Sequence, residues 1–367
     1  MASTDFTKLK KEELKEECKK RGLKGYSTKN KDDLVNLLVT TTTAPTTPTP
    51  SSPSPLLKPA MKWVGGKSQI LDAVLDTFPP SMNNYYEPFV GGGSVLLGLL
   101  SHIQSGKITV KGTVYASDLN ANLIHLYQNI QSRVEALIAE LEKLAASYTP
   151  LPRASEPPNR APASLTEAQA NQESFYYWMR AQFNKLTAAE RAEPRASALL
   201  LFLNKTCFRG VYREGPHGFN VPFDKTYKNP AIYDAAHLRA LSAAFAHVVF
   251  MVAPFQTALA PVAAGDFVYL DPPYAPESET SFVSYTADGF TKEAHEALFK
   301  HAKELVAAGA SFTMSNANVK MVRDAFPPTE FNTTVIDARR AINSKNPESM
   351  TKEVLVVPAP PATLTHL

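Results

Sequence analysis

The feature that most limits the possible folds is an alternation of short apolar runs with longer helical stretches from Ala60 onward. Runs rich in β-branched and aromatic residues are typical of strands, and their alternation with helices is typical of a mostly parallel sheet covered by helices. We therefore predict an α/β domain. The expected strands are residues 85–90, 113–117, 267–270, 310–314 and 353–357.

Polar residues follow several of these expected strands directly. Asp118, Asp271 and the pair Ser315-Asn316 each stand where an apolar run ends. In open α/β sheets, ligands bind at the edge formed by the carboxyl ends of the strands. The sequence therefore predicts a ligand site built from these residues.

A glycine loop follows the first expected strand. Gly91-Gly92-Gly93 lets the backbone turn sharply and approach a ligand, and the helix expected over residues 94–100 would present free N–H groups to it. Asp118 would accept hydrogen bonds from ribose hydroxyls. The loop lacks the spacing of a dinucleotide-binding motif, and a tight structural turn is the alternative interpretation.

The tetrapeptide Asp271-Pro272-Pro273-Tyr274 indicates the chemistry. An exocyclic amine of a base is a poor nucleophile, because its lone pair is delocalised into the ring. Two acceptors, the Asp271 carboxylate and the Pro272 carbonyl, would orient the amine. Each such group can raise the rate of reaction by about 10²–10³-fold. The prolines hold these acceptors rigidly, and Tyr274 offers a face on which an extruded base can stack. We predict that this tetrapeptide is the catalytic centre of a methyltransferase.

A loop in which aromatic and basic residues alternate indicates nucleic acid. The run 204–213 and its continuation through 218–223 to Lys225 and Lys228 contain the residue types that contact bases and phosphates. An arginine in such a loop commonly reads guanine. A surface loop without a partner is the alternative interpretation.

Other features narrow the function classes. The formal net charge is only +3, so a DNA-binding surface must come from local placement of Lys and Arg. The eight histidines show no metal-ligand spacing with cysteines, so we expect no metal site. The chain has no Pro-Cys pair, which argues against a cysteine nucleophile acting on cytosine carbon, and it lacks a Walker loop and a Gly-x-Ser-x-Gly motif.

Cysteine usage and hydropathy bear on the compartment. Cys18 and Cys207 lie in unrelated contexts and form no disulfide framework, which is typical of a reducing environment. The sequence shows no signal peptide and no run of about 20 apolar residues that could cross a membrane. We expect a soluble, intracellular protein that does not bind membranes.

The chain is expected to have three segments. Residues 1–39 show leucines at helical spacing among charged residues, which predicts a small, mildly basic helix–turn–helix unit. Residues 40–59 are rich in Thr and Pro and predict a semi-stiff linker. Residues 60–367 form the α/β domain, with a Pro-rich surface insertion at about 145–172.

Residues 60 to about 357 resemble the Dam-type family of DNA adenine-N6 methyltransferases, because several short motifs occur in the family's order. The matching motifs are Lys62–Lys67, Glu87–Ser94, Ser117–Asn120, Phe183-Asn184, Leu203–Arg213, Phe219–Phe223, Asp271–Tyr274 and Arg339–Ile342. The chain departs from the family by the Pro-rich insertion. It also departs by the reduced basic run at residues 343–347, so we do not count on DNA contacts there.

The resemblance implies a Rossmann-like S-adenosylmethionine-dependent methyltransferase fold with an inserted, mainly helical target-recognition region at about 122–250. It implies S-adenosylmethionine as the methyl donor, double-stranded DNA as the partner, no metal, and a mechanism for which a monomer suffices. The expected cofactor-binding residues are Trp63, Lys67, Phe89, Gly91, Gly93, Asp118 and Asp271. The expected DNA-binding residues are Lys62, Phe208, Arg209, Val211, Arg213 and Pro222.

The resemblance also suggests individual roles at the DNA. Phe208 would wedge into the base stack, Arg213 would read a guanine, and Lys62 would touch a flanking base. The loop is similar to that of members that recognise GATC, although other targets stay open. Whether the enzyme partners a restriction nuclease or serves regulation also stays open.

Residues 4–39 resemble a SAP motif, a two-helix module that usually grips DNA without strong sequence specificity. The matching residues are 14–23, 27–28 and 31–38. On a linker, such a module would raise the effective DNA concentration at the catalytic domain. A charged helical hairpin without DNA affinity is the alternative.

Two further functions remain as rivals. One is methylation of RNA adenine or of a glutamine amide, since related x-Pro-Pro-Tyr motifs act on those substrates; Trp63, Phe208 and Arg213 favour duplex DNA. The other is a catalytically decayed DNA-binding protein, against which the retained donor-site residues argue.

Overall fold

The structure is a computed structural model, and it describes residues 9–20, 26, 29–35, 38, 56–153, 159–226, 230–275, 290–339 and 350–360. The chain divides into two compact units, Met1–Pro55 and Leu56–Leu367, which are described separately. Among the described residues, every helix is too short or too polar to cross a membrane.

The first unit contains α1 (Lys11–Lys20) and a second helical stretch at residues 31–35. Leu14, Cys18, Leu34 and Leu38 are fully buried and form its core. Asn30 begins the second stretch, because its side chain accepts the backbone N–H of Asp33 at 2.9 Å. The turn expected at Gly22 and Gly25, and the helix start expected at Ser27-Thr28, lie outside the described residues.

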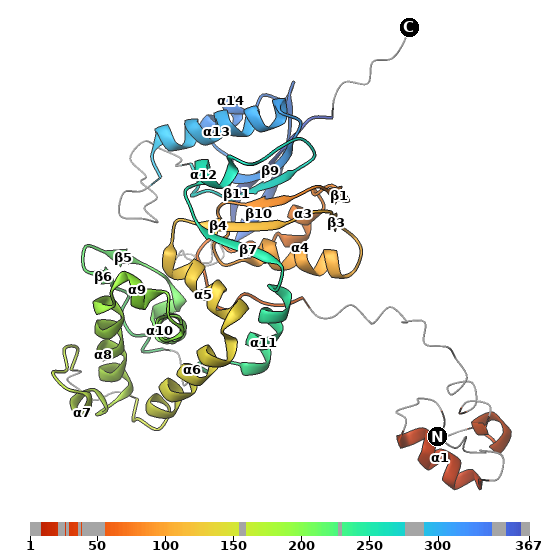
Figure 1. Ribbon diagram of the computed structural model, residues 1–367, viewed down its shortest axis with the longest axis vertical. Coiled ribbons are helices and arrows are strands. Elements are labelled where there is room, and N and C mark those ends of the chain that lie inside the picture. Colours follow the sequence, from red (N-terminus) through yellow and green to blue (C-terminus); the bar gives the residue numbers. More distant parts are fainter. Residues whose placement is uncertain are drawn as a thin grey trace. The chain divides into compact units, whose positions relative to one another are not determined.

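A seven-stranded sheet is the centre of the second unit (Figure 1). Its strand order is β10-β11-β9-β8-β2-β4-β7. Strands β9, β8, β2, β4 and β7 run parallel, and β11 is antiparallel to both of its neighbours, β9 and β10. The bounds are β2 Tyr85–Glu87, β4 Val114–Asp118, β7 Val248–Val252, β8 Phe267–Leu270, β9 Ser311–Ala317, β10 Phe331–Arg339 and β11 Met350–Pro358. The expected α/β fold is confirmed.

Several strand bounds differ from the prediction. Strand β2 ends at Glu87, because Pro88 offers no backbone donor to the ladder and the chain then turns into the glycine loop. Strand β9 continues to Ala317, so Ser315 and Asn316 lie within the strand and not after it. Strands β7 and β10 were not among the expected strands.

Alternate residues of the central strand β8 face two different apolar cores. Phe267 and Tyr269 belong to a core shared with α3 (Leu71–Leu75), α4 (Ser94–Gln104) and α5 (Ala121–Ser132). Val268 and Leu270 belong to a core shared with α12 (Phe255–Leu259), α13 (Lys292–Ala307) and α14 (Lys320–Ala325). The sheet is therefore covered on both faces, which holds its strand ends in fixed positions. Two short strands, β1 (Ser81–Met82) and β3 (Thr109–Val110), pair with each other in a separate parallel sheet.

A mainly helical region separates β4 from β7 and forms a lobe beside the sheet (Figure 1). Its elements after α5 are α6 Val134–Tyr148, α7 Leu165–Ala168, α8 Gln172–Lys185, α9 Ala188–Arg191, α10 Pro194–Thr206, the 3₁₀ turn η2 Phe208–Gly210, β5 Glu214–Gly215, β6 Gly218–Phe219 and α11 Ala235–Ala244. Helix α10 is buried along most of its length. The Pro-rich segment starts later than expected, because α6 continues to the buried Tyr148.

Candidate active site

The glycine loop has the backbone conformation that glycine favours. Gly91 has φ 47° and Gly93 has φ 74°, both in the left-handed region. The N–H of Gly91 donates to Asp118 Oδ2 at 3.1 Å, and its carbonyl accepts the Tyr127 hydroxyl at 2.5 Å. Gly93 is the N-cap of α4 and offers no side-chain cap, so the first turn of this helix keeps N–H groups available for an anion.

Trp63 fills the space beside this loop. A Cβ atom on Gly91 would lie 3.1 Å from Trp63 Cδ1, and one on Gly92 would lie 2.9 Å from Trp63 Cβ. These two glycines therefore admit the indole side chain of Trp63, a reason for glycine that the sequence did not reveal. Trp63 also stacks on Tyr212, with ring centroids 5.2 Å apart.

Asp118 lies at the carboxyl end of β4 and braces the loop. Its Oδ1 accepts the N–H of Asn120 at 2.9 Å, while its Oδ2 accepts the N–H of Gly91. Burial raises the pKa of Asp118, and these backbone donors oppose the rise. A carboxylate oxygen can accept more than one hydrogen bond, so the expected contact with ribose hydroxyls is compatible with these bonds.

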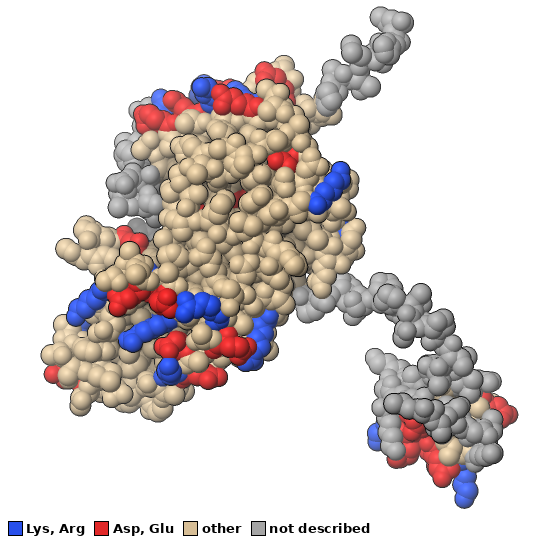
Figure 2. All heavy atoms as spheres, viewed as in Figure 1, with Lys and Arg blue, Asp and Glu red and all other residues tan. Residues whose placement is uncertain are grey.

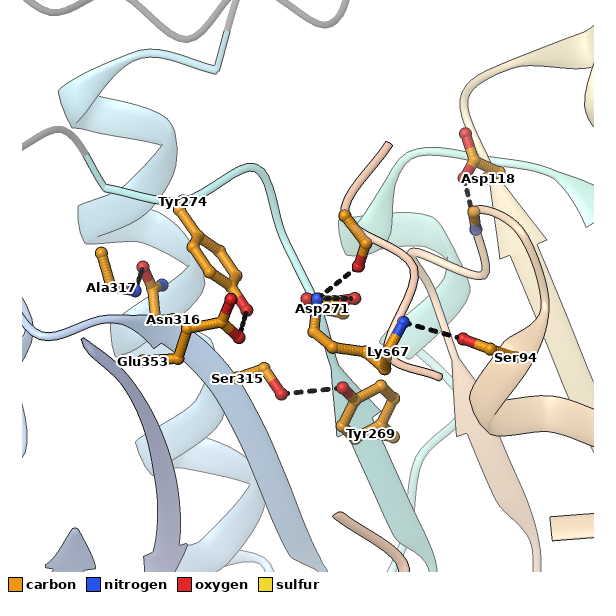
Figure 3. Close-up of polar contacts among 12 residues, drawn as sticks. Lys67, Ser94, Asp118, Tyr269, Asp271, Tyr274, Ser315, Asn316, Ala317 and Glu353 are labelled. Carbon is orange, nitrogen blue, oxygen red and sulfur yellow. Dashed lines mark hydrogen bonds and ion pairs between the residues drawn. The ribbon is translucent and has the colours of Figure 1, made fainter. Parts of the chain in front are cut away.

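Asp271 lies directly after β8 and forms an ion pair with Lys67 (Figure 3). Lys67 Nζ is 2.7 Å from Asp271 Oδ2 and also donates to the Gly65 carbonyl at 2.7 Å. The two side chains are 5% and 18% exposed. Burial raises the pKa of Asp271 to about 6; Lys67 acts against the rise, and Glu353 adds to it. The carboxylate is thus ionised at neutral pH and fixed in direction.

Tyr274 completes this group, and Figure 3 shows it beside Asp271. Lys67 Nζ lies 4.9 Å from the centroid of its ring. Its hydroxyl donates to Glu353 Oε2 at 2.6 Å. Burial, followed by the charges of Asp271 and Glu353, raises the pKa of Tyr274 well above its usual value, so the hydroxyl stays protonated. Pro272 between them is buried.

Polar residues of β9 form hydrogen bonds next to both ends of the tetrapeptide. The side-chain oxygen of Asn316 accepts the N–H of Ala275 at 3.0 Å and that of Ala317 at 2.8 Å. The hydroxyls of Tyr269 and Ser315 lie 2.7 Å apart. The residue after Tyr274 is thereby tied to the sheet.

Phe89, which follows β2, lies in an aromatic cluster. Its ring centroid is 5.8 Å from that of Phe255 and 6.0 Å from that of Phe290. Two of these rings lie just after strands of the sheet, Phe89 after β2 and Phe255 after β7, so the cluster lies near the carboxyl ends of both strands.

Asn204 joins the expected DNA-contacting loop to the segment at Lys62. Its side chain accepts the N–H of Lys62 at 3.0 Å and donates to the carbonyls of Lys62 and Gly210 at 3.0 and 2.8 Å. Gly210 has φ 69°, and a Cβ atom there would lie 2.7 Å from Lys62 Cδ. The resemblance predicted that Lys62 and this loop both bind DNA. The structure shows that they are in contact.

The tip of this loop is strained and exposed. Arg209 has φ 58°, the only positive φ of a non-glycine residue in the described part of the chain, and its N–H donates to Asp224 Oδ2 at 3.1 Å. Such a conformation costs about 1–3 kcal/mol and persists mainly at functional sites. Phe208 is 43% exposed, and the Pro222 carbonyl accepts its N–H at 2.8 Å.

Arg213 lies at the base of the short hairpin formed by β5 and β6. Its Nε donates to Asn220 Oδ1 at 2.6 Å, and a terminal guanidinium nitrogen is 3.3 Å from the Asn220 carbonyl. Arg213 is exposed, whereas Val211 is half-buried against the core. Asn220 therefore fixes the direction of the guanidinium.

Charge on the face drawn in Figure 2 is locally mixed. Lys and Arg gather over the helical lobe, but Asp and Glu lie between them, which agrees with the small net charge. Among the described residues, no group of three or more His, Cys, Asp or Glu could hold a metal ion. Lys228, Arg340, Ala341 and Ile342 from the sequence motifs lie outside the described residues.

The structure therefore brings the expected residues into two adjoining groups. Gly91 lies against Trp63 and donates to Asp118, Lys67 contacts both Asp271 and Tyr274, and Lys62 contacts the expected DNA-contacting loop at Asn204 and Gly210. Sequence reasoning missed Glu353 and Tyr127 as site residues, and it gave no individual role to Asn204, Tyr212 or Asn316, although their segments were predicted to lie at the site. Glu353 had one weak signal, an acidic residue directly before the apolar run 354–357.

Comparison with known proteins identifies related chains. The family model described as D12 class N6 adenine-specific DNA methyltransferase matches residues 63–342. The type II methyltransferase M.MjaIII of Methanocaldococcus jannaschii is 34% identical over 297 residues, which cover 79% of this chain and 94% of that protein. The type II methyltransferase M1.LlaDCHI of Lactococcus lactis subsp. cremoris is 29% identical over 294 residues (79% and 91%). The DNA adenine methylase of Escherichia coli K12 is 29% identical over 287 residues (77% and 88%).

Proposed function

This chain belongs to the D12 class of N6 adenine-specific DNA methyltransferases, and on that premise we propose that S-adenosylmethionine is its methyl donor and that Asp271 is its catalytic carboxylate. The observation that carries the proposal is the Lys67–Asp271 ion pair beside Tyr274, at the carboxyl edge of the sheet. It holds an ionised acceptor next to an aromatic face, as methylation of a planar amine requires.

The proposed donor pocket lies between Trp63, the glycine loop and Asp118. The uncapped first turn of α4 suits the carboxylate of the donor's methionine part, Asp118 suits its ribose, and the rings of Trp63 and Phe89 suit its apolar and adenine surfaces. When bound, the donor supplies an electrophilic methyl group on its sulfonium.

Asp271 would accept a hydrogen bond from the target amine, while Lys67 keeps its carboxylate ionised and aimed. The Pro272 carbonyl is proposed as the second acceptor. Tyr274 would provide the face on which the extruded adenine stacks, which offsets the few kcal/mol needed to unstack the base. The amine nitrogen would bond to the methyl carbon as the sulfur–methyl bond breaks and leaves a neutral thioether, and one amine proton would then pass to water. This direct transfer requires no covalent enzyme intermediate and only one chain.

For DNA, we propose that Phe208 enters the base stack, that Arg213 contacts a guanine, and that Lys62, Arg209, Val211 and Pro222 line the same surface. The strained, exposed tip and its anchors to Asn204 and Asp224 support this assignment. GATC is the target that the loop suggests. Residues 1–39 would add non-specific DNA affinity through the linker 40–59.

The biological setting is proposed from the relatives. Two of them are named type II methyltransferases, which supports a role beside a restriction nuclease. Methylation of RNA adenine or of a glutamine amide is less well supported, since the matched family and the relatives are DNA methyltransferases by name.

A substrate competition assay tests the proposal. The protein is incubated with methyl-labelled S-adenosylmethionine and equal amounts of duplex DNA, the corresponding RNA and a glutamine-containing protein extract. We expect label only in N6-methyladenine of duplex DNA. Label in RNA or protein, or failure to bind the donor by calorimetry, would overturn it.

A further inference from the structure

Glu353 lies on β11, far in sequence from the catalytic tetrapeptide, yet contacts it directly. In the sheet it pairs with Ala317 of β9 and Ile336 of β10. Its carboxylate accepts the hydroxyl of Tyr274 at 2.6 Å across 79 residues of sequence. A hydroxyl-to-carboxyl hydrogen bond at this distance is short and belongs to the stronger class.

The tetrapeptide is anchored at a second point. Asn316, fully buried on β9, accepts the N–H of Ala275 at 3.0 Å. The backbone after Tyr274 is thus held by β9, while the hydroxyl at the far end of the side chain is held by β11. Two fixed ends leave the Tyr274 ring little freedom to rotate.

The direction of the Tyr274 hydrogen bond is also fixed. Burial and the nearby charges of Asp271 and Glu353 raise the pKa of Tyr274 well above its usual value, so the hydroxyl stays protonated and donates. Lys67, which pairs with Asp271, lies 4.9 Å from the ring centroid. The plane of the ring and the position of the catalytic carboxylate are therefore set within one connected group of side chains.

We propose that Glu353 is a positioning residue for methyl transfer, which holds the ring of Tyr274 in the plane on which the target adenine stacks. The inference rests on the role proposed above for Tyr274. Without Glu353 the ring can turn, and the stacked base then presents its amine to Asp271 at a poorer angle. Because in-line transfer depends steeply on geometry, the loss falls on the chemical step.

A double-mutant cycle tests this role in the full-length protein. The variants are Glu353→Ala, Glu353→Gln, Tyr274→Phe and the double variant Glu353→Ala/Tyr274→Phe. We expect Glu353→Ala and Tyr274→Phe each to lower kcat about 10-fold, as for loss of one hydrogen bond, with KM for DNA and the Kd for the donor unchanged. Glu353→Gln keeps an acceptor oxygen and should lose no more than about 3-fold.

The double variant decides whether Glu353 acts through Tyr274. We expect it to lose about 10-fold, no more than either single variant, since both changes remove the same bond. A loss of about 100-fold, or an unchanged kcat for Glu353→Ala, overturns the inference. Asp337→Ala, which removes an exposed carboxylate from the neighbouring strand β10, is the matched control and should keep its kcat.

Failure of the inference and failure of the proposed function are distinguishable in this design. If the unsubstituted protein does not methylate adenine in DNA, the proposed function fails. If it does so and the Glu353 variants behave otherwise than expected, only the positioning role fails. A purely structural role would lower the melting temperature and would not be rescued in kcat by Glu353→Gln.

Discussion

Trp63 stacks on Tyr212, with ring centroids 5.2 Å apart and planes inclined by 29°. Trp63 also packs against the glycine loop, and Tyr212 belongs to the loop that follows Phe208. The proposed donor pocket and the proposed DNA-contacting loop are therefore in contact through this pair of rings. We therefore expect a change in the loop to alter donor binding, and a change in the pocket to alter the loop.

Tyr212→Ala should weaken donor binding, although Tyr212 lies in the proposed DNA-contacting loop. The stacked pair contributes about 0.5–1.5 kcal/mol, which corresponds to roughly a 2- to 12-fold rise in Kd. Tyr212→Phe keeps the ring and removes only the hydroxyl that accepts from Asn122, so it should bind the donor normally. Calorimetry with S-adenosylmethionine compares the two. Equal affinities for the Ala and Phe variants would show that the stack is irrelevant to the donor.

Activity should depend on pH through Asp271. The carboxylate must be ionised to accept from the amine, so kcat/KM should fall as pH drops through about 6. Lys67 lowers the pKa of Asp271, so Lys67→Met should raise this pKa and move the acidic limb to higher pH. A pH–rate profile measures both. Lys300→Met, on the exposed face of α13, is the control; an unmoved limb in Lys67→Met would contradict the assignment.

Stability should fall in mild acid because of His295. This side chain is 1% exposed, neither ring nitrogen has a hydrogen-bond partner in the described part of the chain, and burial lowers its pKa to about 4. The imidazole of the unfolded chain is protonated below about pH 6.5, whereas the buried imidazole stays neutral down to about pH 4. The free energy of unfolding is therefore unaffected by His295 above pH 6.5 and decreases as the pH falls from 6.5 toward 4. The loss is at most about 3 kcal/mol.

Urea unfolding at pH 7.5 and pH 5 measures this effect. His295→Leu should reduce the pH dependence, whereas His247→Leu at an exposed position should not. Identical pH dependence in the parent protein and His295→Leu would rule out His295 as its source.

Arg209 should lower the free energy of unfolding through its strained backbone and increase DNA affinity through its guanidinium. Arg209→Gly relieves the left-handed strain and should be about 1 kcal/mol more stable than Arg209→Ala, which retains it. Both variants lose the guanidinium, so both should bind duplex DNA more weakly and to a similar degree. Thermal unfolding and a mobility-shift titration test the two parts. Equal stability of the Gly and Ala variants would mean that the strain is absent in solution.

The sequence predicted best what is encoded in consecutive residues. Strand β8 occupies the apolar run 267–270, and Asp271 follows it as expected. Strand β10 escaped prediction because polar residues 332–334 interrupt its apolar pattern, and it is an edge strand with much of its length exposed. Edge strands need little burial, so their sequence carries a weaker signal.

The site was predictable only in part for the same reason. The glycine loop and the tetrapeptide are compact motifs. Asn204 contacts Lys62 across 142 residues, and Glu353 reaches Tyr274 across 79. These contacts depend on sheet register and on the packing of α10, which no local pattern records.

The central claim is that Asp271 serves methyl transfer to adenine N6 in duplex DNA. The most direct measurement is mass-spectrometric quantification of N6-methyladenine, after incubation of duplex DNA with isotope-labelled S-adenosylmethionine and either the unsubstituted protein or Asp271→Asn. The account predicts labelled N6-methyladenine with the first and at least about a 100-fold loss with the second, while DNA retention in a mobility-shift assay is preserved. Undiminished methylation by Asp271→Asn, or no labelled adenine from a folded, DNA-bound protein, would contradict it.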